Sequence, residues 1–401
     1  MAVINMTRSV QMASQETTLV RDVDESMLKL EPDAAPLWVL TNNAKKRAPS
    51  VAPKFEWFED AEVPLWGQVN GATDYSSVAT TITVYDTTIF AVNDLVVVPA
   101  GNTQSLPDEV ILVTAVNTAG SQIGVVRNLG GLNGNTITAQ SALRILGQAC
   151  VEGGPVGEVR STMKQNHYSY CQYFRTPIQT TDVMEATEAY SIPEGERIYQ
   201  RGVALVRHRS EIEAAGLWGQ KYQNLAQGGS QWATDGLKAI IQTWITNFNT
   251  TITYSAMLQF GEMGFRYGEK EKLCMAGPHV LSAFDYFSAN KILTNVQDSV
   301  FGVTIKKIVC NHGTYMVANN FRMEAGISGQ AGFNDELYLI DLPSVTYRYL
   351  AGNGKNLNTK LYENVVQDGS ARTVDEYRSM VGWQIRFDKK HARGFNITQY
   401  D

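Results

Sequence analysis

The feature of the sequence that most constrains the fold is one long helical stretch in a chain that is otherwise rich in β-strand patterns. Ser191 and Glu194 fit the S-x-x-E capping box, Pro193 lies in the first turn, and no further proline follows for many turns. A helix from Ile192 to about Tyr222 would span roughly 45 Å at 1.5 Å per residue. The other elements of the chain must therefore pack along this length.

The apolar residues of this stretch form two lines rather than one face. One line has a spacing of seven and the other lies roughly 100° or more around the axis; they contain Ile198, Leu205 and Ile212, and Tyr199, Val203, Val206 and Leu217. Four arginines between the lines are matched by glutamates, which indicates a helix that packs on more than one side. In the simpler alternative this is an ordinary two-sided core helix, in which Arg207 and Arg209 pair with Glu211 and Glu213 at i+4.

Two β-rich regions precede the helix. Residues 68–150 consist of short β-branched runs separated by Gly, Asn and Asp, a texture that is typical of a compact all-β unit. Within this unit, we predict a hairpin from Glu109 to Arg127, with its turn at Asn117 to Gly120. A second β stretch covers residues 166–181. We therefore expect an inserted all-β domain before the helix.

The region after the helix mixes helical and strand patterns. From Leu237 to Phe248 the apolar residues recur at i, i+3, i+4, i+7, i+8 and i+11, which predicts an amphipathic helix. Residues 272–277 predict a strand that leads into a helix opened by Pro278, and further strands are expected up to residue 350. The last 50 residues are β-rich, with 379–387 and 394–398 predicted as a closing hairpin.

Composition excludes several classes of protein. The 401 residues carry a formal net charge of −6, so any contact with nucleic acid would be local or weak. No apolar run is long enough to cross a membrane, and the N-terminus lacks the apolar core of a signal peptide. The four cysteines lie far apart without a C-x-x-C pair, which predicts free thiols rather than a zinc site or disulfides.

The sequence contains none of the local motifs that usually indicate catalysis. It has no nucleophile elbow, no H-E-x-x-H pattern and no phosphate-binding loop, and its five histidines are widely dispersed. We therefore predict no catalytic residues, no metal site and no cofactor. The basic cluster at residues 386–393 is interpreted as a solvated end of the closing hairpin. An enzyme site assembled from distant residues would need a titratable cluster in a pocket.

The order of these segments resembles that of the major capsid proteins of tailed bacteriophages with the HK-97-like fold. The strings that carry the resemblance are FEWFED (55–60), NHYSYCQYFRTPIQTT (166–181), ERIYQRGVALVRHRSEIEAAGLWG (196–219), FGVTIKKIVCNHGTYMVANNFRM (301–323), and the tail from NVVQDG to HARGFNI (364–397). The resemblance covers nearly the whole chain. It implies an α+β fold with an N-arm, an E-loop, a spine helix, an axial domain and a peripheral domain, plus an inserted all-β domain.

The resemblance also assigns each part of the chain. It implies an N-terminal arm (1–53), E-loop strands (54–67 and 151–182), the spine helix of the peripheral domain (183–235), the axial domain (236–345) and a closing peripheral β segment (346–401). The inserted β domain (68–150) departs from the family, because it is larger than a plain E-loop needs. From their polar composition we expect residues 1–50 to lie on neighbouring subunits and to become ordered only in the shell.

The function implied is that of a major capsid protein, which self-assembles into hexamers and pentamers and forms the icosahedral head around double-stranded DNA. Such a protein assembles in the host bacterial cytoplasm and resides in the virion. The implied partners are copies of itself, a portal protein, a decoration protein and the packaged DNA, which it contacts non-specifically. Only about 50 residues precede FEWFED, so the resemblance implies a separate scaffolding protein. No cofactor or membrane is implied.

The candidate residues for contact between subunits belong to FEWFED and to the helix. They are Phe55, Glu56, Trp57, Glu59, Asp60, Arg197, Arg201, Arg207 and Arg209. We expect the arginines to pair with acidic residues across subunit seams, those of FEWFED among them. The alternatives are the shell protein of a cellular encapsulin-like nanocompartment, an enzyme, and a tail or decoration protein.

Overall fold

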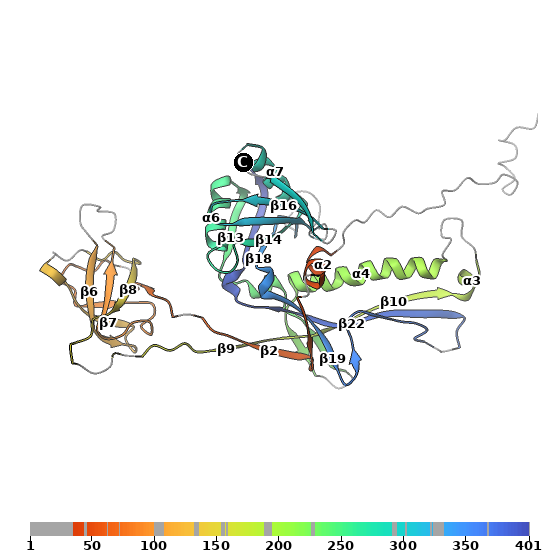
Figure 1. Cartoon of the computed structure of the whole chain (residues 1–401), viewed down its shortest axis with the longest axis horizontal. Coiled ribbons are helices and arrows are strands. Elements are labelled where there is room, and N and C mark those ends of the chain that lie inside the picture. The colour runs from red at the N-terminus through yellow and green to blue at the C-terminus, as the bar shows by residue number, and fades with distance from the viewer. Residues whose placement is uncertain are drawn as a thin grey trace, which may run out of the picture. The chain divides into compact units, whose positions relative to one another are not determined.

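The computed structural model divides the chain into two compact units, Phe58–Asn166 and the remainder, Met1–Trp57 with His167–Asp401 (Figure 1). The described residues are 35–400 except 44–45, 62, 72, 100–107, 132–135, 154–156, 158, 188–194, 226–228, 291–294, 301–302, 321–322, 324–332 and 367–368. Side chains at 288–290, 295–300 and 303–304 are also outside the description. The predicted capping box and most of the N-terminal arm thus lie outside the described residues.

One sheet of the larger unit has the strand order β1-β19-β22-β10. These strands are Arg47–Ser50, Val345–Gly352, Arg372–Ile385 and Gln172–Thr181, and the short strands β20 (Lys355–Asn356) and β21 (Lys360–Tyr362) join at β19 and β22. β10 and β22 are antiparallel over ten residue pairs, whereas β1 runs parallel to β19. This sheet brings the start of the chain, its middle and its end together.

The second sheet of the larger unit has seven strands in the order β13-β23-β18-β14-β17-β16-β15. They are Ile245–Ile252, Ala392–Tyr400, Leu337–Ile340, Glu271–Ala276, Thr314–Asn319, Val303–Val309 and Asn295–Val300. β14 is central and its residues after Glu271 are all buried, as expected for a short apolar run with strands on both sides. The helices α6 (Tyr254–Gly264) and α7 (Pro278–Asn290) share an apolar core with this sheet. The predicted strand at 272–277 and the helix opened by Pro278 are confirmed.

The long helix α4 runs from Glu196 to Trp218, a shorter span than predicted. Gly195 precedes it with a φ of 90°, and the chain after Gly219 continues into the small hairpin β11 (Tyr222–Asn224) and β12 (Gln231–Ala233). Its C-terminal half is buried against the first sheet, where a Cβ at Gly216 would lie 2.7 Å from the Trp383 ring. The last turns of α4 therefore pack closely against Trp383, where only glycine fits at position 216.

Two predictions for the C-terminal half are wrong. The helix expected from Leu237 to Phe248 is only the four-residue α5 (Leu237–Ile240), and the strand β13 follows from Ile245. Phe248 and Ile252 are buried on that strand, so burial at alternate positions replaces helical spacing after Ile241. The closing hairpin is also wrong, because β22 and β23 belong to different sheets and pair with different strands.

The described end of the N-terminal arm packs on its own chain. The helix α2 (Pro36–Asn43) was not predicted, and its Leu37 and Leu40 are buried in the main core. β1 then adds to β19 through backbone pairing. The expectation that residues 1–50 are ordered only by neighbouring subunits is therefore corrected for residues 35–43 and 47–50, because apolar burial and strand pairing within the chain hold these residues.

The smaller unit is a six-stranded β barrel with the order β3-β8-β5-β6-β7-β4, which are Trp66–Gln68, Ala142–Gln148, Asp94–Val98, Glu109–Asn117, Gln122–Val126 and Thr81–Thr83. The Val69–Val84 bridge and the hydrogen bond from Tyr85 N to Gln68 O, 3.1 Å, join the first strand to the last. Its apolar core consists of aliphatic and aromatic side chains, and the unit also buries Asp94 and the ion pair between Arg127 and Glu109. The predicted β6–β7 hairpin is confirmed, and Gly120 N donates to Asn117 Oδ1 in its turn.

Two further strands, β2 (Lys54–Glu59) and β9 (Gln165–Tyr170), pair with each other where the chain passes between the units. The remaining elements are the short helix α3 (Asp182–Glu185) and the 3-10 turns Leu129–Gly131, Phe333–Asp335, Leu342–Ser344 and Asp388–Lys390. Sheets and helices are thus mixed throughout the larger unit, and the α+β fold class is confirmed.

Candidate functional site

The buried histidines have structural hydrogen bonds. His208 lies between the hydroxyls of Thr176 and Ser379, at 2.8 and 2.6 Å. Burial lowers its pKa, although the nearby Glu211 acts in the opposite direction. His391 accepts a hydrogen bond from Asp341 N–H, and burial lowers its pKa to about 4. Both rings are therefore neutral at physiological pH and fix neighbouring segments.

The cysteines and the buried lysine are likewise structural in their surroundings. Cys171 and Cys274 are buried free thiols, and burial raises the pKa of Cys171 to about 12. Lys272 is fully buried and donates three hydrogen bonds of 2.6 Å to the carbonyls of Gly264, Tyr267 and Lys390. Burial lowers its pKa to about 8. The lysine ammonium therefore ties the end of α6 to the turn before β23.

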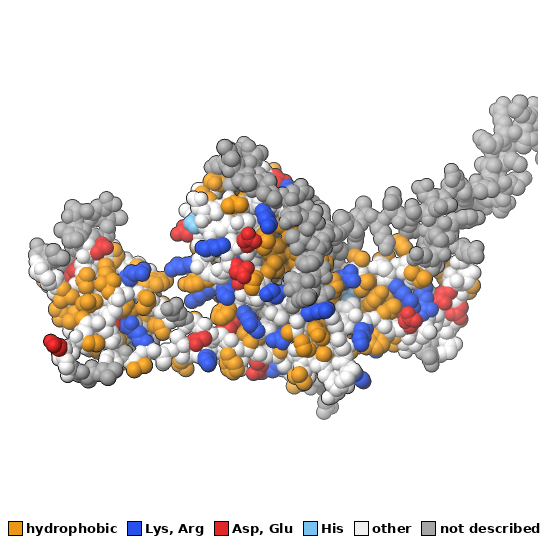
Figure 2. Space-filling model, viewed as in Figure 1, with side chains coloured by type: hydrophobic (Ala, Val, Ile, Leu, Met, Phe, Trp, Pro, Cys, Tyr) orange, Lys and Arg blue, Asp and Glu red, His pale blue; other side chains and the backbone are white. Residues whose placement is uncertain are grey.

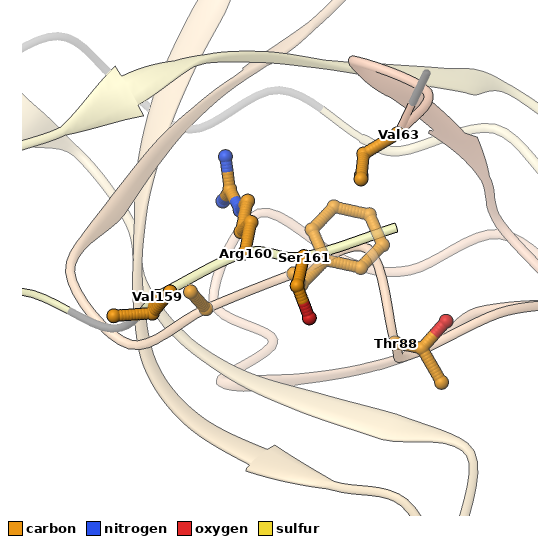
Figure 3. A pocket seen from close by; sticks show the side chains of 7 residues that line it. Val63, Thr88, Val159, Arg160 and Ser161 are labelled. Atoms are coloured by element: carbon orange, nitrogen blue, oxygen red, sulfur yellow. The ribbon is translucent and has the colours of Figure 1, made fainter. Parts of the chain in front are cut away.

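Among the described residues, no group of three or more His, Cys, Asp or Glu is arranged to hold a metal ion. Nor is any helix in that part of the chain long and apolar enough to cross a membrane. A hollow of about 200 Å³ in the smaller unit is lined by Val63, Thr88, Phe90, Ala91, Val159, Arg160 and Ser161 (Figure 3). Arg160 forms an ion pair there with the buried Asp94, which fastens the returning chain to the barrel.

The candidate residues of FEWFED lie on β2 and just after it. Phe55 is buried beside Cys171 and Met380, and its ring stacks on Trp57, which in turn stacks on His167. Glu56 points to the solvent side and pairs with Lys54. Asp60 accepts a hydrogen bond of 2.8 Å from Thr162 Oγ1. Glu59, the last residue of β2, is half-buried.

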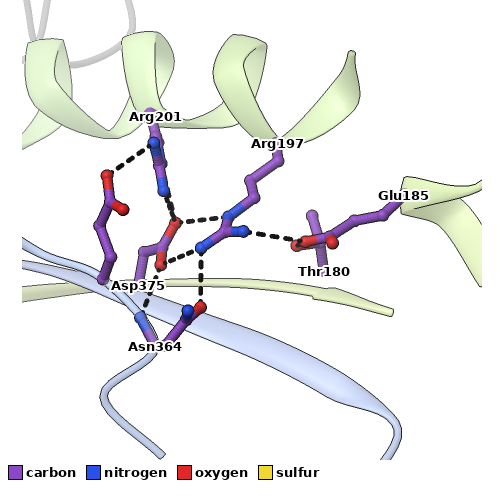
Figure 4. Close-up of polar contacts among 7 residues, drawn as sticks. Thr180, Glu185, Arg197, Arg201, Asn364 and Asp375 are labelled. Atoms are coloured by element: carbon purple, nitrogen blue, oxygen red, sulfur yellow. Dashed lines mark hydrogen bonds and ion pairs between the residues drawn. The ribbon is translucent and has the colours of Figure 1, made fainter. Parts of the chain in front are cut away.

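Arg197 and Arg201 converge on one carboxylate of their own chain (Figure 4). Asp375 on β22 accepts from Arg197 at 2.7 and 2.8 Å and from Arg201 at 2.7 and 2.8 Å. Glu363 and Glu185 pair with the outer sides of the two guanidinium groups, at 3.0 and 3.6 Å. This Asp375 cluster fastens the first turns of α4 to the first sheet.

The neighbours of Asp375 favour the ionised form of its carboxyl group. Burial alone would raise the pKa of Asp375, but hydrogen bonds from Arg197, from the backbone N–H of Asn364 and from Arg201 outweigh it. These bonds hold the pKa well below its ordinary value. Arg197 and Arg201 are thus already paired with a carboxylate of their own chain. Among the candidate arginines, only Arg207 and Arg209 remain for ion pairs between subunits.

Those two arginines differ from each other. The Arg207 side chain is 74% exposed and pairs with Glu211 at 2.9 Å, as the intrahelical alternative predicted. Arg209 lies instead over the Trp38 ring at 4.7 Å. The predicted partner of Arg209, Glu213, is buried and accepts from Asn320 Nδ2 at 2.5 Å and from Trp38 N at 3.2 Å.

Sequence reasoning missed an apolar band on the outside of the barrel. Its members are Trp66, Leu146 and Val126, which are exposed, and the half-buried Leu95, Val97, Val110 and Leu112. Cross-strand pairing makes the band continuous, with Val97 opposite Val110 and Leu112 opposite Val126. Figure 2 shows hydrophobic side chains over the barrel. The unbroken apolar runs of β5 and β6, which do not alternate with polar residues, were the signal that could have revealed two apolar faces.

A family model and several solved structures match the chain. A family model described as SU10 major capsid protein matches residues 5–398. No curated protein matches the chain. Among solved structures, the capsid of a native GTA particle is 8% identical with a TM-score of 0.49 and covers 98% of this chain and 100% of its own.

Two other solved structures are similar at the same level. Microbacterium phage Oxtober96 is 11% identical with a TM-score of 0.43, covering 99% of this chain and 100% of that one. The SrpI encapsulin from Synechococcus elongatus PCC 7942 is 12% identical with a TM-score of 0.42, covering 60% of this chain and 80% of that one.

Proposed function

Because the chain belongs to the SU10 major capsid protein family, we propose that it assembles into hexamers and pentamers that close an icosahedral shell around double-stranded DNA. As a major capsid protein it is a structural component of the virion shell, which is built from many copies of one chain. The observation that carries the proposal is the family match, which extends from residue 5 to residue 398.

The surfaces of the two units support this proposal. The barrel closes on itself, so it offers little free strand edge, and contact with another copy would use side chains. Its outer apolar band is the kind of surface that soluble proteins cover by association. We propose that this band, β2 with Phe55, Glu56, Trp57, Glu59 and Asp60, and the exposed Arg207 contribute to contacts between copies.

The proposal also covers the proteins that this chain contacts during assembly and the compartment in which it assembles. We propose that the shell grows on a portal protein with the help of a separate scaffolding protein, in the cytoplasm of a bacterial host. A decoration protein is a further proposed partner, with the barrel as its site. The net charge of −6 favours only weak, salt-sensitive contact with the packaged DNA.

Electron microscopy of the expressed full-length chain tests this proposal. Closed icosahedral particles, formed with a co-expressed scaffolding protein where the chain alone does not close, are the expected result. The contents then separate the two shell functions, because a capsid from infected cells contains genomic DNA whereas a nanocompartment contains a cargo protein. A chain that remains monomeric in every one of these preparations would contradict the proposal.

A further inference from the structure

A single arginine lies within the apolar band on the outside of the barrel. On β8, Arg144 is exposed and lies opposite Trp66 on one neighbouring strand and Val97 on the other. No carboxylate among the described residues forms an ion pair with it. Burying a guanidinium group without an acceptor is costly. A partner that covers the band must therefore bring a carboxylate as well as apolar side chains.

The charge of the smaller unit limits which surface that partner presents. Residues 58–166 include ten acidic and four basic residues, so the net charge of −6 that the whole chain carries lies in this unit. Two of the basic residues, Arg127 and Arg160, are paired with carboxylates inside the unit. Two barrels that met band to band would bring their Arg144 guanidinium groups together, which is costly between like charges. The band therefore fits a different surface, one that is apolar and acidic.

A surface of this kind lies at the start of the same unit. Phe58 on β2 is 70% exposed, the largest exposed fraction among the described Phe, Tyr and Trp side chains. Asp60 is also exposed and accepts a hydrogen bond from Thr162, and no cation in the described part of the chain pairs with it. Large apolar side chains left exposed in this way are typical of surfaces that another molecule covers.

The two surfaces match in the spacing of their residues. Phe58 and Asp60 lie two residues apart and are both exposed, whereas Glu59 between them is half-buried. Leu146 and Arg144 lie two residues apart on the outer side of β8. In extended chain, each pair is separated by roughly 6.6 Å. One placement therefore brings the Asp60 carboxylate to Arg144 and the Phe58 ring to Leu146 at the same time.

We propose that Phe58 and Asp60 of one copy dock on the apolar band of a neighbouring copy, with Asp60 at Arg144 and Phe58 at Leu146. Both surfaces belong to one compact unit and both are exposed in it, so they do not cover each other within the chain. A surface that binds a different surface of the next copy repeats head to tail, which closes a ring when the rotation fits. The inference rests on the proposed function, because a shell of many copies supplies the neighbour.

Disulfide trapping between two variants of the full-length chain tests this contact. In a chain with Cys150→Ser and Cys310→Ser, copies carrying Phe58→Cys are assembled into particles together with copies carrying Leu146→Cys and are then oxidised. Each copy has one accessible thiol, so every disulfide joins two copies. The matched control uses Thr118→Cys in place of Leu146→Cys, because Thr118 is exposed in the β6–β7 turn, outside the band. We expect at least about tenfold more mixed dimer in the test particles, since docking raises the effective concentration of the two thiols.

Exchange of the two charges gives a readout that needs no cysteine. Arg144→Glu and Asp60→Arg should each lower the yield of particles at least about fivefold, because each brings like charges together at the contact. The denaturation curve of the monomer should hardly change, because both side chains are exposed in the single chain. A chain with both substitutions has the pair with reversed signs and should recover most of the yield.

The outcomes separate this contact from shell formation. Closed particles with equal dimer yields in the test and control mixtures would overturn the docking and leave the proposed function in place. The same holds for a doubly substituted chain that assembles no better than either single variant. A wild-type chain that stays monomeric in every preparation would overturn both.

Discussion

The two halves of α4 are held by different forces. The C-terminal half is buried by apolar contacts, with Ile212 and Leu217 in the main core and Trp383 Nε1 donating to Ile212 O at 3.1 Å. The N-terminal half has no buried residue before His208 and is fastened by the Asp375 cluster. Apolar burial does not depend on the ionisation of side chains, whereas paired charges respond to pH and are screened by salt. We call the apolar packing of the C-terminal half of α4 its permanent attachment. We call the ion pairs of the Asp375 cluster at the N-terminal half its conditional attachment, because they require a charged Asp375.

Truncation of the tryptophan should have the largest effect, because it removes the permanent attachment. Trp383→Ala deletes a ring that is 1% exposed and that contacts Gly216, Tyr347 and the Ile212 carbonyl. The expected loss in the free energy of unfolding is about 3–5 kcal/mol, measured by denaturant titration of the monomer. Trp383→Phe keeps most of the volume and should lose much less. If both variants lost the same free energy of unfolding, packing of the Trp383 ring would not be what stabilises the C-terminal half of α4.

Neutralising the shared carboxylate should release the conditional attachment and leave the other in place. Asp375→Asn should cost about 2 kcal/mol, because two guanidinium groups lose their charged acceptor. Amide exchange should accelerate in the first turns of α4 while residues near Leu217 stay protected. Uniform acceleration along the whole helix would show that the two halves do not act separately.

The same attachment should depend on acidity with a definite sign. The pKa of Asp375 is lowered on folding, so its stabilisation is fully present above the ordinary aspartate pKa, near 3.9, and is lost as the pH falls toward the lowered value. Wild type should therefore lose stability over this interval faster than Asp375→Asn. Parallel curves from denaturant titrations at a series of pH values would contradict the assignment.

His208 lies where the two halves meet and should produce a smaller effect at higher pH. Burial lowers its pKa, so the neutral ring stabilises the fold above the ordinary pKa of histidine, and this contribution is lost as the pH falls through the lowered value. His208→Gln, which retains hydrogen-bonding groups toward Thr176 and Ser379, should cost about 1 kcal/mol at neutral pH. It should also flatten the stability curve below pH 6.5, whereas an unchanged slope would assign the titration to another group.

The sequence predicted the permanent half of the helix better than the conditional half. Apolar spacing locates Ile212 and Leu217 correctly because burial leaves a periodic pattern in the sequence. The Asp375 cluster joins residues that are 174 and 178 positions apart, and no local pattern reports such a pair. For the same reason the charges of Arg197 and Arg201 suggested a partner outside the chain, although their carboxylate, Asp375, lies on β22 of the same chain.

The limits were similar elsewhere in the fold. The β6–β7 hairpin could be predicted because its turn and its strands are adjacent in sequence. β22 and β23 were expected to pair for the same reason, yet β22 pairs with β10 and β23 with β13. Sequence identifies strands, but the choice among distant partners depends on which apolar faces can be buried together. The helix at 237–248 failed because a four-residue helix followed by a strand can satisfy the same apolar spacing over a short window.

Reversal of the exposed charge should have the smallest effect on the fold and separates folding from assembly. Arg207→Glu replaces the pair with Glu211 by a repulsion, at a cost of about 0.5 kcal/mol on so exposed a surface. If Arg207 faces an acidic residue of another copy, this variant should lose particle yield while its denaturation curve hardly moves, because the same repulsion recurs at every seam of a closed shell. Arg207→Lys keeps the charge and should assemble normally. Wild-type particle yields from Arg207→Glu, counted by electron microscopy, would assign this arginine to the intrahelical pair alone.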